Sequence, residues 1–180
     1  MTNRSKVSAA LVALFFLSTS TAARAQDITP STSELPSLAS DLTKHVIFDP
    51  TTYVPAAMLY TSMRLDWRSS QPFFERGFVE ANDRYTISGR SHDVPVSFAQ
   101  GKHQILIDSL LNLPMSFANN ATSRVVERML VQRFPNHPKL FHALGWAERT
   151  AFAGYMSNRL AGKHFRQWQQ NVELARQLGY

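Results

Sequence analysis

The sequence predicts an all-α protein, a bundle of four or five helices, and three observations support this prediction. After His45, apolar residues recur at intervals of three and four, which is the spacing of one helix face. The chain shows little of the strict alternation that is typical of half-buried strands. The nine Pro fall mainly between the apolar stretches, where they end or begin helices.

The first half of this bundle can be divided into elements by its Pro and Gly residues. A first helix is predicted over residues 54–71, because Pro55 is tolerated in a first helical turn. Pro72 then either kinks this helix or starts a short second one that runs through Phe78. Residues 82–95 are expected to form a loop or a short hairpin around a Ser-Gly pair.

The second half of the chain predicts longer helices. One is expected over residues 98–113 and the next over residues 117–134, because both show apolar residues at helical spacing. The two Pro in residues 134–138 make the clearest break in the chain. Residues 139–178 contain no Pro and predict one long helix or two in line, with Gly179 placed to end it.

The apolar faces of these helices are expected to pack against each other and form the core. Six side chains are expected to be largely buried: Leu106, Leu110, Val126, Leu130, Leu144 and Phe152. The last helix also carries a stripe of small residues, which would let a neighbouring helix approach closely within the core. The stripe consists of Ala143, Ala147, Ala151 and Gly154.

The first 25 residues have the layout of an export signal. Arg4 and Lys6 precede an apolar run at residues 7–17, and small residues at 23 and 25 match the requirement of signal peptidase. The run is too short for a membrane span, which needs about 20 residues. We therefore expect cleavage after Ala25 and a periplasmic or secreted protein, or a membrane-anchored one if the signal is retained.

The chain is thus expected to contain a signal peptide (1–25), a flexible lead-in (26–44) and a single helical domain (45–180). The lead-in is rich in Ser, Thr and Pro and poor in large apolar groups. There is no Cys, so the domain cannot use disulfides and must be stabilised by core packing.

Charge and motifs exclude several function classes. Three of the 19 Lys and Arg but none of the 13 acids lie in the signal, which leaves a net charge of +3 after cleavage. That charge and export both argue against a nucleic-acid partner. The chain lacks the spacings of zinc, calcium and di-iron sites, of phosphate-binding loops and of the Gly-x-Ser-x-Gly elbow. We therefore expect no metal and no cofactor.

Four carboxylates interrupt apolar stretches and are the weak candidates for catalysis: Asp66, Glu80, Asp108 and Glu148. Burying a carboxylate is costly unless it is paired, so each is expected to lie on a polar helix face or to pair with an Arg. Asp66 in particular is expected to accept hydrogen bonds from an Arg or from backbone N–H groups. The alternative is that two of the four converge in a cleft as a general acid and base.

Residues 66–82 carry the most motif-like segment, D-W-R-S-S-Q-P-F-F-E-R-G-F-V-E-A-N. It resembles an Asp…Ser/Thr…Gly-x-x-Glu-x-Asn pattern of small bacterial membrane proteins, which usually have Pro after the Asn where this chain has Asp83. Residues 45–180, with the ending H-F-R-Q-W-Q, resemble a family of uncharacterised exported bacterial proteins. Neither resemblance implies an activity.

The C-terminal helix is predicted to be amphipathic, with basic and aromatic residues interleaved. Such a helix can lie on an anionic membrane or dock on a protein partner, or it can pack back onto the bundle. The residues that would make the contact are Phe165, Arg166, Trp168 and Arg176.

Together these features predict an exported, non-enzymatic helical domain of the bacterial envelope that acts by contact with a partner or as a scaffold. The first alternative is a hydrolase-like enzyme that uses Asp66 or Glu80 with a His. The second alternative is a membrane-associated helical bundle.

The export signal gives a direct prediction. We expect the exported protein to begin at Gln26, because signal peptidase cleaves after small residues in the pattern present at residues 23–25. N-terminal sequencing of protein recovered from the periplasmic or secreted fraction measures this. Recovery of a chain that still begins at Met1 or Thr2 would contradict it.

Overall fold

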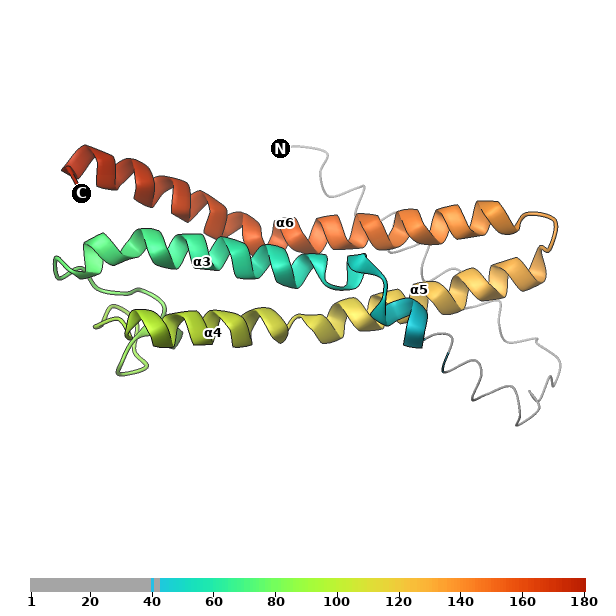
Figure 1. Ribbon diagram of the computed structural model, residues 1–180, viewed down its shortest axis with the longest axis horizontal. Coiled ribbons are helices and arrows are strands. Elements are labelled where there is room, and N and C mark those ends of the chain that lie inside the picture. Colours follow the sequence, from blue (N-terminus) through green and yellow to red (C-terminus); the bar gives the residue numbers. More distant parts are fainter. Residues whose placement is uncertain (1–39, 41–42) are drawn as a thin grey trace, which may run out of the picture. The chain divides into compact units, whose positions relative to one another are not determined.

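The computed structural model describes residue 40 and residues 43–180, all of which belong to the unit Ala39–Tyr180. The predicted signal peptide and almost all of the lead-in therefore lie outside the described residues. Four long α-helices fill the described part, with two isolated β-bridges and no longer strand there (Figure 1). The predicted all-α bundle is confirmed. None of the helices in this part is long and apolar enough to cross a membrane.

Helix α3 (Val54–Phe74) lies between two other helices and packs along both, α6 on one side and α4 on the other (Figure 1). A short 3-10 turn, η2 (Pro50–Thr52), precedes it and is capped by the Asp49 side chain, which accepts from Thr51 N at 3.1 Å. Pro72 lies inside the last turn of α3 and does not break it. The helix therefore extends three residues beyond its predicted end.

Helices α4 (Phe98–Leu110) and α5 (Leu113–Arg133) follow each other nearly in line, with a two-residue break between them (Figure 1). A capping box starts α4, since Ser97 Oγ accepts from Gln100 N and Gln100 Oε1 accepts from Ser97 N. Helix α6 (Pro138–Leu178) is a single helix of 41 residues that ends at Gly179 in the left-handed conformation. One long helix, rather than two in line, is thus the observed arrangement.

The segment between α3 and α4 forms an irregular hairpin, as the sequence predicted. Antiparallel bridges join Glu80 to Asp93 and Thr86 to Pro95. A 3-10 turn, η3 (Asp83–Tyr85), lies inside it, and the tip turns at Gly89 with φ of 69°. This hairpin covers one end of α3 and α4.

The apolar core lies where α3 meets α4 and the hairpin. Its buried side chains are those of Leu59, Met63, Trp67, Tyr85 and Ile105. A Cβ atom at Gly101 would overlap the Trp67 indole. Gly101 therefore permits the close approach of α4 to α3 that buries this Trp.

The prediction of the core from the sequence is mostly wrong. Four of them are 40–53% exposed: Leu106, Leu110, Val126 and Leu144. Leu130 and Phe152 are half-buried. The small-residue stripe (Ala143, Ala147, Ala151 and Gly154) also lies on an exposed face of α6. On α4, Leu106 and Leu110 lie outside the buried face, which Gly101, Ile105 and Ser109 form. For Val126 and Leu144 the reason is that α5 turns polar residues inward: Ser116, Asn120, Ser123 and Glu127 are its buried side chains.

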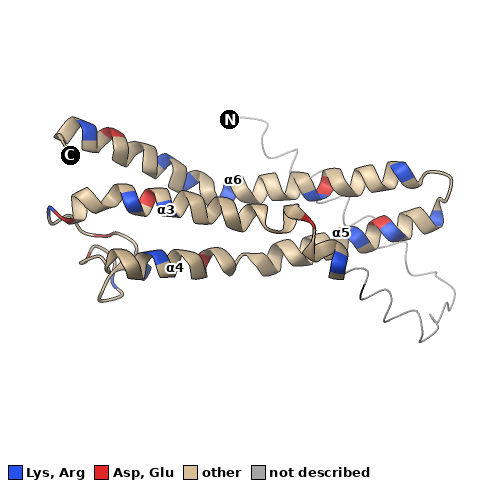
Figure 2. Ribbon diagram, viewed as in Figure 1, with Lys and Arg blue, Asp and Glu red and all other residues tan. Residues whose placement is uncertain are grey.

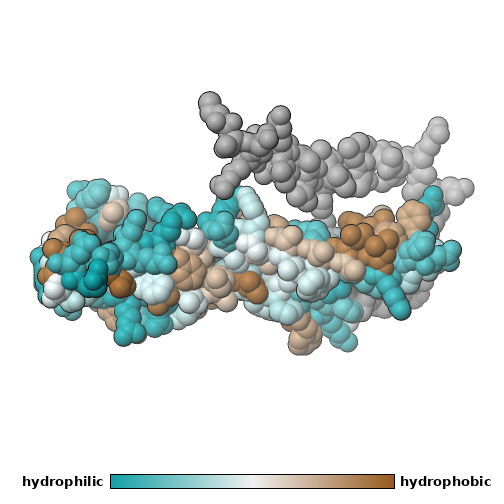
Figure 3. All heavy atoms as spheres, turned by 90° about the horizontal axis from the view of Figure 1, so that it is seen from above, coloured by the Kyte–Doolittle hydropathy of each residue, from teal (hydrophilic) through white to brown (hydrophobic). Residues whose placement is uncertain are grey.

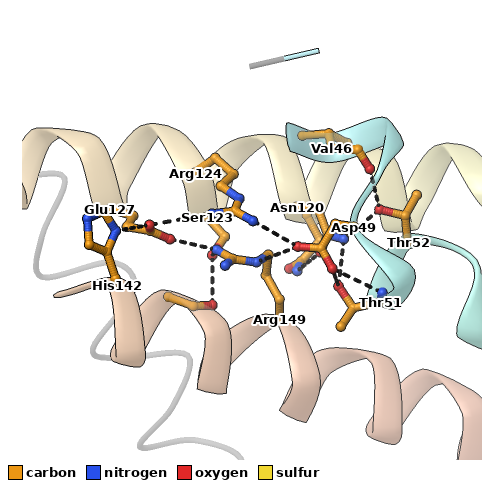
Figure 4. A network of polar contacts seen from close by, with 12 residues as sticks. Val46, Asp49, Thr51, Thr52, Asn120, Ser123, Arg124, Glu127, His142 and Arg149 are labelled. Atoms are coloured by element: carbon orange, nitrogen blue, oxygen red, sulfur yellow. Dashed lines mark hydrogen bonds and ion pairs between the residues drawn. The ribbon is translucent and has the colours of Figure 1, made fainter. Parts of the chain in front are cut away.

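Three of these residues, Asn120, Ser123 and Glu127, belong to a network centred on Arg149, which is only 2% exposed (Figure 4). Arg149 Nη1 donates to Glu127 Oε2 at 2.8 Å, and Arg149 Nε lies 2.9 Å from Asp49 Oδ2. Arg124 Nη2 donates to the same Asp49 oxygen at 3.2 Å. The network therefore joins the segment before α3 to both α5 and α6.

The two buried acids of this network are held in their charged form. Burial alone would raise the pKa of Asp49, but hydrogen bonds from Thr51 and the charges of Arg149 and Arg124 lower this pKa below its ordinary value. At Glu127, burial also raises the pKa, but hydrogen bonds from His142 and Arg149 lower it, and the pKa of Glu127 lies below its ordinary value. The charged carboxylates of Asp49 and Glu127 therefore stabilise the fold at neutral pH. This stabilisation is lost as the pH falls through their lowered pKa values.

Replacing Arg149 with Ala should destabilise the fold by about 3–5 kcal/mol, because two buried carboxylates would lose their main partner. Urea denaturation at neutral pH measures this loss. Arg159→Ala is the matched control on the same helix, since Arg159 is exposed, and it should cost less than about 0.5 kcal/mol. Equal effects of the two substitutions would contradict the role given to Arg149.

Candidate functional site

A cavity of about 620 Å³ opens between the C-terminal half of α3, the C-terminal part of α6 and the hairpin that follows α3. Its walls combine aromatic and acidic side chains. Asp66 and Glu80 both line it, together with His164, Asn171 and Ser70. Two of the four candidate carboxylates thus converge on one cavity.

Asp66 and His164 form the central pair of the cavity. Asp66 Oδ2 lies 2.8 Å from His164 Nδ1, and Asp66 Oδ1 accepts from Asn171 Nδ2 at 3.3 Å. His164 and Asn171 are seven residues apart on α6, which places them two turns apart on one helix face. The pair ties α3 to α6, and the expected partners of Asp66, an Arg or backbone N–H groups, are not those observed.

Two hydroxyl groups adjoin this pair but are already engaged. Ser69 Oγ and Ser70 Oγ donate to the Asp66 carbonyl at 2.8 and 3.0 Å. Each also accepts from Asn171 Nδ2, at 3.1 and 3.0 Å. Both hydroxyl hydrogens are therefore used on the α3 backbone.

Glu80 enters the cavity from the hairpin. Its backbone exchanges two hydrogen bonds with Asp93, and its Oε1 accepts from Asn82 N at 2.7 Å. Burial raises the pKa of Glu80 above its ordinary value, and the negative charge of Asp66 raises this pKa further. Glu80 thus holds its charge at an energetic cost at neutral pH.

Aromatic rings form the apolar wall of the cavity. Five line it: Trp67, Phe73, Phe74, Phe78 and Tyr85. The Trp67 ring lies 5.4 Å from that of Phe74 and 5.5 Å from that of Tyr85, between centroids. These contacts fix the ring positions before any ligand binds.

The other two candidate carboxylates do not line the cavity. Asp108 pairs with Arg84 and accepts from Tyr85 Oη at 3.0 Å and from Gln104 Nε2 at 2.8 Å, so it anchors the hairpin on α4. Burial, reinforced by the Asp108 carboxylate, raises the pKa of Tyr85 well above its ordinary value. Glu148 lies on the other half of α6, with a buried Oε2 that has no hydrogen-bond partner.

Sequence reasoning missed His164 and Asn171, and it missed the network acids Asp49 and Glu127. Glu127 could have been found, because it is the only acid between Asp108 and Glu148. The partnership of Asp66 with residues about 100 positions later carries no local signal. Among the described residues, no three His, Asp or Glu side chains gather closely enough to hold a metal ion.

The C-terminal helix residues predicted to contact a partner are only partly available. Phe165 and Trp168 are half-buried, with ring centroids 6.5 Å apart. Arg176 pairs with Glu173 at 2.8 Å, while Arg166 is exposed. This part of α6 forms one wall of the cavity.

Comparisons of the chain with known protein families, with curated proteins and with solved structures found no match. The cavity and the chemistry of its walls therefore provide the basis for the functional proposal.

Replacing Glu80 with Gln should raise the melting temperature at about pH 7.5, because the variant removes a charge that burial and Asp66 disfavour. The gain should shrink towards zero near pH 4, where the raised pKa keeps Glu80 protonated in the folded state and the unfolded chain also takes up the proton. Thermal unfolding followed by circular dichroism measures both values.

Glu75→Gln is the control, since Glu75 is exposed just after α3 and does not line the cavity. Its melting temperature should follow that of the parent at both pH values. A lower melting temperature for Glu80→Gln at neutral pH would refute the electrostatic account of the site.

Proposed function

We propose that this protein is a non-enzymatic binding domain of the bacterial envelope, and that its cavity binds a small organic cation with an apolar body. One observation carries the proposal, namely that the carboxylates of Asp66 and Glu80 share an aromatic-walled cavity. The predicted export signal supports the location. The binding role agrees with the contact function expected from the sequence.

Electrostatics favours a positively charged ligand. The carboxylate of Asp66 disfavours the charge on Glu80, so a cation placed between them would relieve an existing repulsion. Asp83 adds a third acid to the lining. Among the described residues that line the cavity, Lys163 is the one Lys or Arg, and it is exposed. An anionic ligand would meet an excess of negative charge.

The aromatic wall favours an ammonium group attached to an apolar body. A cation over an aromatic face gains about 0.5–2 kcal/mol, more where water is excluded. Trp67 and Phe74 already pack against each other, so little side-chain ordering is needed on binding. Asn171 and His164 add polar groups that fix the orientation of the ligand.

The Asp66–His164 pair favours a second candidate function, the hydrolase-like enzyme. An Asp that holds His Nδ1 leaves Nε2 to act as a general base, which is the arrangement of hydrolytic triads. Both neighbouring hydroxyls donate to the α3 backbone, so such an enzyme would have to activate water directly. Binding requires no further group and is therefore the better supported function.

Phenylethylamine and phenylacetate make a matched pair of probes, because they share a ring and differ in the sign of their charge. We expect calorimetry to show saturable binding of the amine. Phenylacetate should bind at least about tenfold more weakly, because the carboxylates of the cavity repel its negative charge. Glu80→Gln should weaken amine binding, while Glu75→Gln should leave it unchanged. Equal affinity for both probes would refute the cation proposal.

Hydrolysis of neutral p-nitrophenyl esters by the same preparations tests the second candidate. Turnover that is lost in both Asp66→Asn and His164→Ala, with folding retained, would favour the enzyme over the binding domain. Turnover unaffected by either substitution would remove this candidate.

A further inference from the structure

The closed end of the α5–α6 hairpin, residues 129–144, exposes several large apolar side chains, and we name it the hairpin tip. Met129, Phe134, Leu140 and Leu144 are 59%, 47%, 54% and 53% exposed. Figure 3 shows apolar atoms gathered over this end of α6. Contiguous exposed apolar surface of this kind marks interaction sites in soluble domains.

The exposure follows from the polar interior of the hairpin. Between α5 and α6 the buried positions are occupied by Ser123, Glu127 and Arg149. The inward faces are therefore already occupied by a polar network, and these large apolar residues are left on the outer faces. An amphipathic helix of a self-contained domain has the opposite pattern, so the outer surface of the tip is arranged for contact with something else.

The charge around the tip is almost entirely positive. Between Asp108 and Glu148 the only acid is Glu127, which is buried and paired with Arg149 and with His142, whose Nδ1 lies 2.5 Å from it. Arg133 and Lys139 flank the loop of the tip, and both are exposed. Figure 2 shows Lys and Arg, in blue, where α5 ends and where α6 begins. The tip thus presents apolar side chains within a basic rim.

The loop of the tip is closed by its own contacts. Phe134 N donates to Leu130 O at 2.9 Å, and His137 N donates to Phe134 O at 3.0 Å. The rings of Phe134 and Phe141 lie 5.6 Å apart. The apolar side chains are therefore presented on a defined scaffold, so docking requires little ordering.

We propose that the hairpin tip docks on the surface of an anionic phospholipid bilayer. Phe134 and Leu140 enter the boundary between headgroups and acyl chains, while Arg133 and Lys139 meet the lipid phosphates. Charge selects this occupant, because a second copy of the chain would bring one basic rim against another. The docking surface lies at the opposite end of α6 from the C-terminal residues that sequence reasoning favoured.

The absence of Cys from the chain allows a site-specific test on the full-length protein. Leu140→Cys labelled with an environment-sensitive NBD fluorophore should show a blue-shifted, brighter emission with vesicles of phosphatidylglycerol and phosphatidylcholine. Vesicles of phosphatidylcholine alone should produce little change. Ile87→Cys with the same label is the matched control, since Ile87 is an exposed apolar residue on the α3–α4 hairpin, and its emission should not respond.

Charge is tested by adding Arg133→Gln and Lys139→Gln to the Leu140→Cys chain. The vesicle concentration for half-maximal response should rise roughly thirtyfold, because each basic residue near an anionic surface contributes roughly a five- to sixfold step. Arg90→Gln on the other hairpin is the control and should leave the response unchanged. The response should also weaken as salt increases.

Two results would overturn the proposal. The first is an NBD response that is equal for tip and control positions, or equal for anionic and neutral vesicles. The second is a response that depends on protein concentration without vesicles and coincides with dimers in sedimentation, which would assign the tip to a second copy of the chain.

Discussion

The arrangement of the helices depends on the guanidinium of Arg149. It satisfies Glu127 from α5 and Asp49 from the segment before α3, so one side chain fixes where three parts of the chain meet. A displacement of α5 along α6 is costly, because it would separate the buried Glu127 carboxylate from Arg149. Gly145 belongs to the same constraint, since a Cβ atom there would overlap Glu127 Oε2. Register is thus specified by charge in the part of the unit where apolar packing is thin.

The other half of α6 is treated differently. There Asp66 and His164 connect α3 to α6, but none of the described residues forms an ion pair with the neighbouring Glu80, and the pKa of Glu80 is raised. One end of the unit therefore pairs Asp49 and Glu127 with Arg149, and the other leaves the Glu80 carboxylate at an energetic cost beside a cavity. A cost of this kind is typical of sites that are completed by a ligand, and this contrast distinguishes the cavity from the structural network.

The sequence predicted the helices better than it predicted the contacts between them. Pro and Gly positions located the break at residues 134–138 and the end at Gly179, because these signals act within a few residues. The core prediction failed for Val126 and Leu144, since it assumed that apolar faces point inward. A buried Arg with two acids reverses that choice, and nothing local in the sequence indicates it. The cavity was anticipated only in part: Asp66 and Glu80 were among the candidates, whereas His164 depends on a pairing across 98 positions.

The break between α4 and α5 separates a region in which three helices pack together from a region in which two helices do. α3 lies between α4 and α6 and packs on both, whereas α5 packs mainly on the first part of α6 (Figure 1). Regions with fewer packed neighbours open locally at a lower free energy than the global unfolding reaction. Because α6 runs through both regions, the protection of its backbone amides against hydrogen exchange should change along a single helix. The two-helix region can then fray and re-form while the region that holds the cavity stays folded.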